Sequence, residues 1–583
     1  MKDVEYEAVK NNGRQGGFRA TYFIFAMMFL DNIGFVANMA SLVLYFMFKM
    51  YFDVGGASTT TTNFLGTAFL LTIVGGFISD TYMTRLNTCL LFGIIQLLGY
   101  MLLVIQSHNS ELQPQPCGKS SCVRGSKAAL FYSSIYLLAL GGGGIRGCIP
   151  ALGADQFDYQ NPHQRNHIAT FFNWLLLSIV LGATIGVTFV VYASIHLGWD
   201  KGFIISMSCS ASALIFIALG KPFYRNRIPG DNSPLLRVLQ VLVVTLRNWN
   251  LRLPQNSDDL YEEKEKRHLP HTNQFRLLDK AAVLLPNGVV SKWRVCGVSQ
   301  VEEVKILTRM MPILLSTIVM NTCLAQLQTV SVQQGTFMDH RLGNFKVPEA
   351  SIPVIPLVFM ILLIPVYEFA FVPFLRRLTG HPNGITHLQR VGVGLVLSAV
   401  SMAVAGAVEV KRKNEFFQHK RVISMFWLSF HYAIFGIADM FTLVGLMEFF
   451  YKEAPAGMRS LSTSFSWMSL AIGYYLNSVL VEVINSVTRS RMGNKTGWVE
   501  GGNVNQSHVQ FFYWFLAVLS VINFVNYVYW ARWYKYKEDV PNDEQELLKH
   551  DVPSAATPST VVGGDHSTVS APFVASNNTN QQE

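Results

Sequence analysis

The chain has 583 residues, of which 50% are apolar, 13% aromatic and only 14% charged, and its mean hydropathy is +0.28. Because an ordinary soluble domain carries about 25% charged residues, this composition argues against a water-soluble globular enzyme. Lys and Arg number 46 and Asp and Glu 37, so the net charge is +9. In a chain this apolar we attribute the excess to basic cytoplasmic loops, and we expect no nucleic acid among its partners.

Apolar segments long enough to cross a bilayer recur along the chain. A hydrocarbon core of about 30 Å requires about 20 predominantly apolar residues in a helix. By this criterion the sequence predicts an all-α membrane protein with twelve transmembrane helices, embedded in the lipid bilayer as six, a long polar segment and six more. The expected spans are 20–48, 62–79, 86–106, 128–153, 168–192, 202–220, 304–330, 350–374, 386–409, 421–450, 460–485 and 510–531.

The polar segment, residues 221–303, contains 13 Lys and Arg residues. An even number of spans separates it from the N-terminus, so the positive-inside rule places both in the cytoplasm. Residues 233–253 carry apolar side chains at helical spacing with arginines between them, which is typical of an amphipathic helix on the membrane surface. The alternative is a soluble docking domain, for which about 80 residues supply little core.

These features predict five regions in the chain. The tail is rich in Ser, Thr, Pro, Asn and Gln, so we expect it to be disordered. The regions are a cytoplasmic N-terminus (1–19), an N-terminal six-helix bundle (20–220), the cytoplasmic central loop with its amphipathic helix (221–303), a C-terminal six-helix bundle (304–533) and the cytoplasmic tail (534–583).

Two loops on the opposite, extracellular side carry candidate modification sites. One of them contains the glycosylation sequons Asn494-Lys-Thr and Asn505-Gln-Ser. The other holds Cys117 and Cys122 close together, where a disulfide could persist. A basic cluster also falls on this side, against the positive-inside rule, but the longer central segment and the sequons outweigh it. The cluster comprises Lys411, Arg412, Lys413, Lys420 and Arg421.

Few ionisable residues stand out within the predicted spans. A charge at the bilayer centre costs about 2.5–3.5 kcal/mol on insertion scales, so each one marks a candidate functional site. They are Asp31 in the first span, Arg146 deep in the fourth and Asp439 near the centre of the tenth. Two acids and one base on separate helices could exchange a proton and hold an anion in a water-filled cavity. The alternative is a static buried pair that only stabilises helix packing.

A glycine run precedes Arg146 and satisfies the letters of a dinucleotide-binding fingerprint at Gly142-x-Gly144-x-x-Gly147. That motif requires a preceding strand and a βαβ unit, whereas this run lies inside an apolar span. Small residues instead permit close helix contact in lipid. No catalytic constellation and no metal-ligand spacing occurs in a suitable context, so we expect neither an enzyme nor a metal site.

The second span ends in GGFISDTYMTR, where Gly76, Asp80 and Arg85 lie at the cytoplasmic edge. An acid and a base at this position could latch onto the end of a neighbouring helix, so we interpret the three residues as a conformational latch. Ordinary interfacial solvation is the alternative. Their spacing resembles the signature of the major facilitator superfamily.

Longer motifs are similar to those of the proton-coupled oligopeptide transporter family and of its plant branch, the nitrate and peptide transporters. Within that branch the chain most resembles subfamily 4, whose characterised members move abscisic acid and gibberellins. The motifs are GADQFD (153–158), FFNW (171–174), LGGGGIRG, QLQTVSVQQGTFMD (326–339), LQRVGVGLVLS and MEFFYKEAPAGMRS (447–460), and the resemblance covers about residues 15–538.

The resemblance implies a major facilitator fold with two six-helix halves, a central cavity and alternating access driven by the proton gradient, without a cofactor. It assigns Arg146 to substrate binding, and Asp31 and Asp439 to proton coupling. The Glu-x-x-Glu-Arg motif that the family carries in the first span is reduced here, because only Asp31 remains acidic and Asn32 replaces the arginine. We include Asn32 in the candidate substrate site.

Two further positions depart from the family pattern. A nitrate-binding histidine would fall at Leu324, in a Leu-Ala-Gln-Leu run that also contains Gln326, and we include both residues in the candidate substrate site. Thr81 lies near a position that is phosphorylated in a nitrate-transporting member. The residue three positions before it is Ile78, so no basic side chain favours a kinase.

These observations predict a proton-coupled secondary transporter of a small anionic organic solute, with a plant hormone such as abscisic acid or gibberellin as the first expectation. Loss of the arginine and of the histidine disfavours nitrate and makes the cavity more apolar, which suits a larger amphiphilic acid. The alternatives are a low-affinity nitrate transporter and a transporter-like solute sensor. We expect the plasma membrane rather than the vacuolar membrane, and the sequence indicates no oligomeric state.

Overall fold

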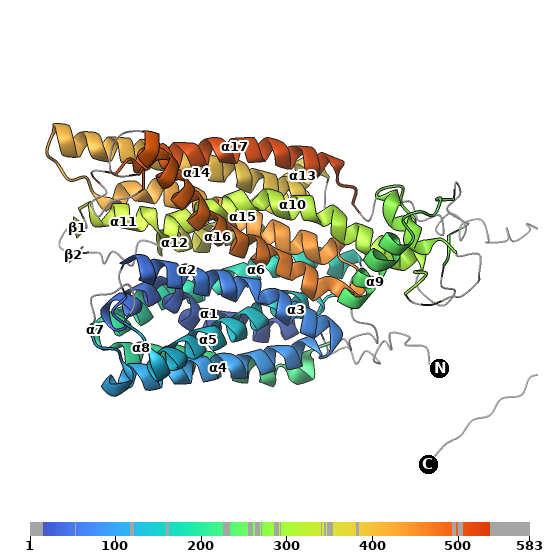
Figure 1. Cartoon of the computed structure of the whole chain (residues 1–583), viewed down its shortest axis with the longest axis horizontal. Coiled ribbons are helices and arrows are strands. Elements are labelled where there is room, and N and C mark those ends of the chain that lie inside the picture. Colours follow the sequence, from blue (N-terminus) through green and yellow to red (C-terminus); the bar gives the residue numbers. More distant parts are fainter. Residues whose placement is uncertain are drawn as a thin grey trace, which may run out of the picture. The chain divides into compact units, whose positions relative to one another are not determined.

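The computed structural model of the chain is almost entirely helical (Figure 1). Within the described residues, twelve helical segments are long and apolar enough to cross a membrane, as predicted. One loop contains two short antiparallel strands, β1 (Arg341–Leu342) and β2 (Phe345–Lys346). The structure describes residues 16–52, 54–116, 122–158, 162–225, 234–254, 260–262, 269, 271–284, 291, 293–339, 341–342, 345–346, 354–380, 384–491, 497–499, 505 and 507–536.

The first six spans form the N-terminal half. The second span breaks at Leu71, and a π-helical turn interrupts the fifth. The elements are α1 (Gly17–Phe48), α2 (Val54–Leu70), α3 (Thr72–Thr81), α4 (Arg85–His108), η1 (Ser110–Leu112), α5 (Gly125–Ala154), α6 (Pro162–Ile185), the π turn η2 (Gly186–Val190), α7 (Val191–His196), α8 (Trp199–Leu219) and η3 (Lys221–Phe223).

The last six spans form the C-terminal half, in which a second π-helical turn interrupts the eighth span. The elements are α10 (Val298–Gln328), α11 (Val330–Thr336), α12 (Val354–Val366), the π turn η7 (Tyr367–Phe371), α13 (Val372–Thr379), α14 (His387–Gln418), η8 (Met425–Trp427), α15 (Leu428–Glu453), η9 (Ala456–Met458), α16 (Arg459–Arg491) and α17 (Val509–Trp533).

Several spans are longer than predicted, and for two of them the structure shows a local reason. The second begins at Val54 instead of 62, because its polar residues remain helical: the Thr61 hydroxyl donates to the carbonyl of Ala57 at 2.8 Å within the same helix. The ninth reaches Gln418 instead of 409, because the charge of Arg412 is paired one turn back along α14. The polar residues at these ends therefore made both helices look shorter in the sequence than they are in the structure.

Glycines allow α5 to pack closely against α3. A Cβ atom at Gly147 would lie 2.1 Å from the carbonyl oxygen of Thr72, and one at Gly75 would lie 2.3 Å from that of Gly144. No larger residue fits at either contact without moving a backbone. The glycine run therefore serves helix packing and places the adjacent Arg146 in the interior of the N-terminal half.

Aromatic side chains join the two halves midway along the bundle. Phe69 of α2 stacks on Trp467 of α16 with ring centroids 5.6 Å apart, and Tyr474 lies 6.1 Å from the same ring. One buried apolar cluster fills the N-terminal half and continues into these residues, while a second cluster fills the C-terminal half. The halves therefore meet along α2, α3 and α16, and also where α6 contacts α12 and α15.

The central segment forms a small helical unit at the end of the bundle that is predicted to be cytoplasmic (Figure 1). It contains α9 (Pro234–Arg247) and η5 (Arg276–Ala282), which share a small apolar core with the start of α10. In α9, Val241 and Val244 are buried in this core, whereas Leu239 and Leu246 are exposed. The helix is therefore amphipathic, with one apolar face packed and another open.

Candidate functional site

A buried ion pair joins α1 to α5 inside the N-terminal half. Nη2 of Arg146 lies 3.1 Å from Oδ2 of Asp31, and the two residues are only 3% and 1% exposed. The ring of Phe35 lies against the guanidinium, with its centroid 3.6 Å from Cζ. Each charge compensates the other in a place where an isolated charge would be costly.

Three polar side chains surround this pair. Gln96 of α4 donates from Nε2 to Oδ1 of Asp31 at 2.6 Å, and Ser210 of α8 donates to the same oxygen at 3.3 Å. Oδ1 of Asn32 accepts a hydrogen bond from Nη2 of Arg146 at 3.0 Å. The Arg146 guanidinium is thus engaged within its own half, and a solute carboxylate would have to compete with Asp31 for it.

Asp439 lies apart from this pair, on α15 of the C-terminal half. It is partly exposed, and none of the described residues forms a hydrogen bond or an ion pair with it. The structure therefore brings together two of the three predicted ionisable residues and leaves the third in the other half.

The two predicted residues on α10 have different surroundings. Leu324 is partly buried and packs against the apolar clusters of both halves. Gln326 is 0% exposed, and neither its amide nitrogen nor its oxygen has a hydrogen-bond partner among the described residues. Because buried polar groups are nearly always satisfied, Gln326 is a place where a water molecule or a polar solute group could bind.

The predicted latch lies at the same end of the bundle as the central segment. Oδ1 of Asp80 lies 3.1 Å from Nη2 of Arg85, and Oδ2 accepts the backbone N–H of Leu461 at 2.9 Å. Arg85 also donates from Nε to Oγ of Ser460 at 2.7 Å. A Cβ atom at Gly76 would lie 2.8 Å from the Ser460 carbonyl oxygen, so this glycine lets the two halves approach.

A second layer of polar contacts extends the latch. Arg85 forms an ion pair with Asp155, which follows α5. The hydroxyl of Tyr451, on α15, donates to Oδ1 of Asp155 at 2.6 Å, and Arg459 lies 3.7 Å from that oxygen. These residues come from both halves and their side chains are buried, so they hold the predicted cytoplasmic end closed.

Of the charged residues within the spans that were not predicted from the sequence, two lie close to the contact between the halves. They are Glu368 in the π turn η7 and Arg390 in α14, and Asn173 of α6 lies between them. Both fall inside segments that hydropathy marks as membrane spans, so a complete survey of ionisable residues in those segments would have found them.

The predicted modification sites differ in accessibility. The Thr81 hydroxyl oxygen is buried, with no hydrogen-bond partner among the described residues, so a kinase could not reach it in this conformation. Oδ1 of Asn505 accepts a hydrogen bond from Nη1 of Arg412 at 2.6 Å. Cys122 is disulfide-bonded. Cys117 and Asn494 lie outside the described residues.

One member of the basic cluster that is predicted to be extracellular forms a buried ion pair. Arg412 is 2% exposed and bonds both carboxylate oxygens of Glu409, at 2.7 and 2.8 Å. Lys413 donates to the carbonyl oxygen of Ser507, and the ammonium of Lys411 lies 3.4 Å from the centroid of a tryptophan ring. Among these contacts only the bonds from Arg412 to Glu409 compensate a charge, and Lys420 and Arg421 are exposed, so the cluster still departs from the positive-inside rule.

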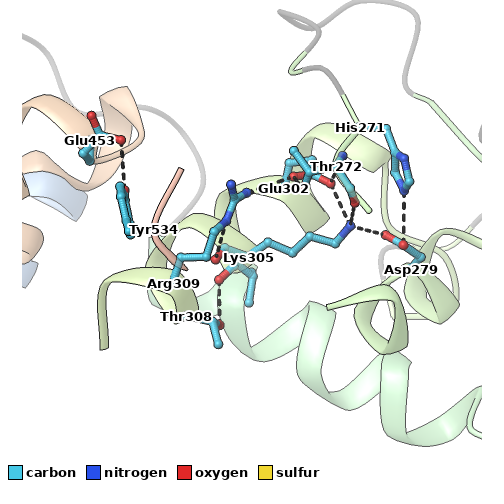
Figure 2. Close-up of polar contacts among 10 residues, drawn as sticks. His271, Thr272, Asp279, Glu302, Lys305, Thr308, Arg309, Glu453 and Tyr534 are labelled. Atoms are coloured by element: carbon cyan, nitrogen blue, oxygen red, sulfur yellow. Dashed lines mark hydrogen bonds and ion pairs between the residues drawn. The ribbon is translucent and has the colours of Figure 1, made fainter. Parts of the chain in front are cut away.

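Figure 2 shows a buried charge cluster where the central segment meets α10. Nζ of Lys305 lies 2.6 Å from Asp279 and 2.8 Å from Glu302. His271 lies 3.1 Å from Asp279, and Arg309 lies 3.3 Å from Glu302. The imidazole and the two carboxylates are close enough together to hold a metal ion, but the Lys305 ammonium already bridges the carboxylates. The cluster therefore fastens the central segment to α10.

Two six-helix halves that share a polar latch at one end define a multi-pass membrane transporter of the major facilitator type, and not an enzyme. The chain matches the family model described as "PTR2: POT family" over residues 86–499. It therefore belongs to the POT family of transporters, as its motifs predicted.

Individual relatives agree with this assignment. The chain is 40% identical over 563 residues to Protein NRT1/ PTR FAMILY 4.6 of Arabidopsis thaliana, covering 90% of this chain and 95% of that protein. It is 42% identical over 543 residues to Protein NRT1/ PTR FAMILY 4.5 of the same plant, covering 90% and 94%. Among solved structures, the POT family transporter PepTSo has a TM-score of 0.62 at 18% identity, covering 88% of this chain and 98% of that chain. These matches confirm the predicted family and fold.

Proposed function

We propose that this transporter couples proton entry to the uptake of a small anionic organic solute, with a plant hormone such as abscisic acid or a gibberellin as the first candidate. The observation that carries the proposal is the ion pair between Asp31 and Arg146, which is buried and electrically neutral as a unit. In such a pair Asp31 can bind a proton while Arg146 binds a solute anion, and no net charge is left in the bilayer.

The exchange follows from the contacts of the pair. A proton on Asp31 would neutralise its carboxylate and leave Arg146 as a buried cation without a counter-ion, which is strongly unfavourable. A solute carboxylate would then be attracted to the guanidinium and could bind it through two parallel hydrogen bonds. Oε1 of Gln96 has no partner among the described residues, so a rotation of that amide would let it accept the new acid proton.

Asp439 is proposed as a second proton site, in the other half. It is partly exposed and lacks a counter-ion among the described residues, so its protonation would not require an existing pair to break. With one proton site in each half, protonation of Asp31 and Asp439 would influence how the two halves close around the solute.

Two side chains support a larger solute over nitrate. Asn32 already accepts a hydrogen bond from Arg146, and Leu324 offers only an apolar surface where the two halves meet. An apolar site with few polar groups suits an amphiphilic acid. One solved POT family transporter was crystallised with 5-aminolevulinic acid, although its identity to this chain is only 14% at a TM-score of 0.57. That complex supports a carboxylate solute for the fold, without identifying the hormone.

Uptake into oocytes tests the proposal. Labelled abscisic acid, gibberellin, nitrate and a dipeptide are supplied at acidic and neutral external pH, each with the unlabelled solutes as competitors. Accumulation of a hormone that rises in acid supports the proposal, whereas accumulation of nitrate alone supports the low-affinity nitrate alternative. Specific binding without accumulation identifies a sensor. A fluorescent fusion in plant cells tests the proposed location in the plasma membrane.

A further inference from the structure

A carboxylate in the eighth span lies at the contact between the two halves. Glu368 occupies the second position of the π turn η7, between α12 and α13, and is partly exposed. π-helical turns are rare and frequently occur at functional sites. An ionisable residue within a membrane span marks a functional site by default. Both observations single out Glu368 independently of the Asp31–Arg146 pair.

Two donors on the opposite half hold this carboxylate. Oγ1 of Thr170 donates to Oε1 of Glu368 at 2.6 Å, and Nδ2 of Asn173 donates to Oε2 at 2.5 Å. Thr170 and Asn173 lie one turn apart on α6, near its predicted cytoplasmic end. Each carboxylate oxygen therefore accepts a bond that crosses from the N-terminal to the C-terminal half.

Arg390 fixes the direction of these bonds. Its Nη2 donates to Oδ1 of Asn173 at 2.6 Å. A guanidinium can only donate hydrogen bonds, so the Asn173 oxygen must face Arg390 and the Asn173 amino group must face Glu368. The amino group of an amide cannot accept a hydrogen bond, so Oε2 of Glu368 must be the acceptor in its bond with Asn173. A proton on Glu368 can therefore be accommodated only at Oε1, opposite the Thr170 hydroxyl.

The other charged groups near this contact lie on α14 and α15. Arg390 packs over the ring of Tyr367, with Cζ 4.6 Å from the centroid. Glu448 of α15 pairs with His387 of α14 at 3.3 Å and with Lys452 at 2.8 Å. Arg390 is thus linked to Glu368 by the two hydrogen bonds of Asn173, whereas Glu448 is paired with His387 and Lys452.

We propose that Glu368 is a proton-binding residue of the transport cycle. Its ionised form holds α6 against η7 and keeps the cytoplasmic end closed, and its protonation releases that end. A proton adds to one carboxylate oxygen and forms an O–H bond, the negative charge is lost, and no covalent bond breaks. Hydrogen bonds to an ionised acceptor are about twice as strong as neutral ones, so both cross-half bonds weaken together.

The proposal rests on the proton coupling proposed above and adds a site at which a proton opens the exit. Glu368 is partly exposed, so a proton can reach it before the halves separate. Thr170 can reverse its hydroxyl and accept from the new acid, whereas Asn173 cannot adapt while Arg390 holds it. Asn173 and Arg390 are positioning residues in this scheme.

Hydrogen–deuterium exchange on the purified full-length protein in lipid nanodiscs tests the proposal without any solute. Exchange is followed in residues 167–174 and 367–378 across a pH series and corrected for the intrinsic pH dependence of amide exchange. The wild type should show several-fold faster corrected exchange in both segments as the pH falls. Glu368→Gln should exchange at the fast rate throughout, without a pH transition. Glu482→Gln, a change at an exposed glutamate of α16, should behave as the wild type.

A second variant distinguishes proton binding from a purely structural clamp. Thr170→Val keeps the shape of the side chain but removes one donor to the ionised carboxylate, so the pH transition should move to higher pH. A structural clamp would instead give faster exchange at every pH, with an unchanged midpoint. A wild type without a transition, or a Glu368→Gln protein with a normal one, overturns the proposal. Failure of solute uptake in oocytes would overturn the proposed function. The exchange experiment uses no solute, so its result would still decide whether Glu368 binds a proton.

Discussion

Arg85, the first residue of α4, donates a hydrogen bond from Nε to Oγ of Ser460, the second residue of α16, at 2.7 Å. The bond joins the two halves of the transporter at the predicted cytoplasmic end. Asp80 strengthens the same contact by accepting the backbone N–H of Leu461. The conformation is therefore closed at this end, and separation of the halves there requires both bonds to break.

Weakening the latch should favour an open cytoplasmic end. In Asp80→Asn one carboxylate oxygen becomes an amino group, which cannot accept a hydrogen bond, so either the bond from Arg85 or the bond from the Leu461 N–H is lost. Loss of one buried bond to a charged group destabilises the closed state by about 1–3 kcal/mol. Uptake should fall several-fold, and amide exchange in residues 80–86 and 456–464 should accelerate. Glu111→Gln, at an exposed position in an outer loop, is the control, and equal exchange in both variants would exclude the latch role.

The twelve spans could be predicted from the sequence because hydropathy and helix length are local properties. The Asp31–Arg146 pair could be predicted only in part. The cost of charge in lipid identifies both residues, but no spacing rule relates positions that are 115 residues apart. The link from Glu368 through Asn173 to Arg390 was missed, because Asn173 is uncharged and its role depends on three helices meeting. Helix ends were also missed where a polar stretch stays helical through internal partners, as in α14.

The Arg412–Glu409 pair should contribute strongly to stability. Arg412→Ala leaves the Glu409 carboxylate buried without its counter-ion and removes the bond to Asn505. Breaking one partner of a buried pair costs about 3–5 kcal/mol, so the thermal midpoint of the purified protein should fall clearly. Lys411→Ala, on the same helix, should change it little. A double variant, Glu409→Gln with Arg412→Met, should recover part of the loss because no lone charge remains.

Asp31 should carry the proton that drives solute uptake. Asp31→Asn resembles the protonated acid, can still bond with Gln96 and Arg146, and removes the titrating group. We therefore expect uptake, normalised to the amount of protein at the cell surface, to lose its rise at acidic external pH. Asp200→Asn, near the outer end of α8, is a matched control whose acid stimulation should remain. Full acid stimulation in Asp31→Asn would show that the coupling proton binds elsewhere.

The charge of Arg146 should decide whether an anion is bound. Arg146→Ala removes the guanidinium and leaves Asp31 without its partner, so the half-saturation concentration for a carboxylate solute should rise strongly or uptake should stop. Arg146→Lys keeps a positive charge but not the planar pair of donors, so part of the uptake should remain. Each variant is tested with a carboxylate solute and with its uncharged ester, normalised to surface protein. Loss confined to the carboxylate supports anion binding. Equal loss of both solutes assigns Arg146 to packing of α5 against α1, because the ester has no charge for the guanidinium to recognise.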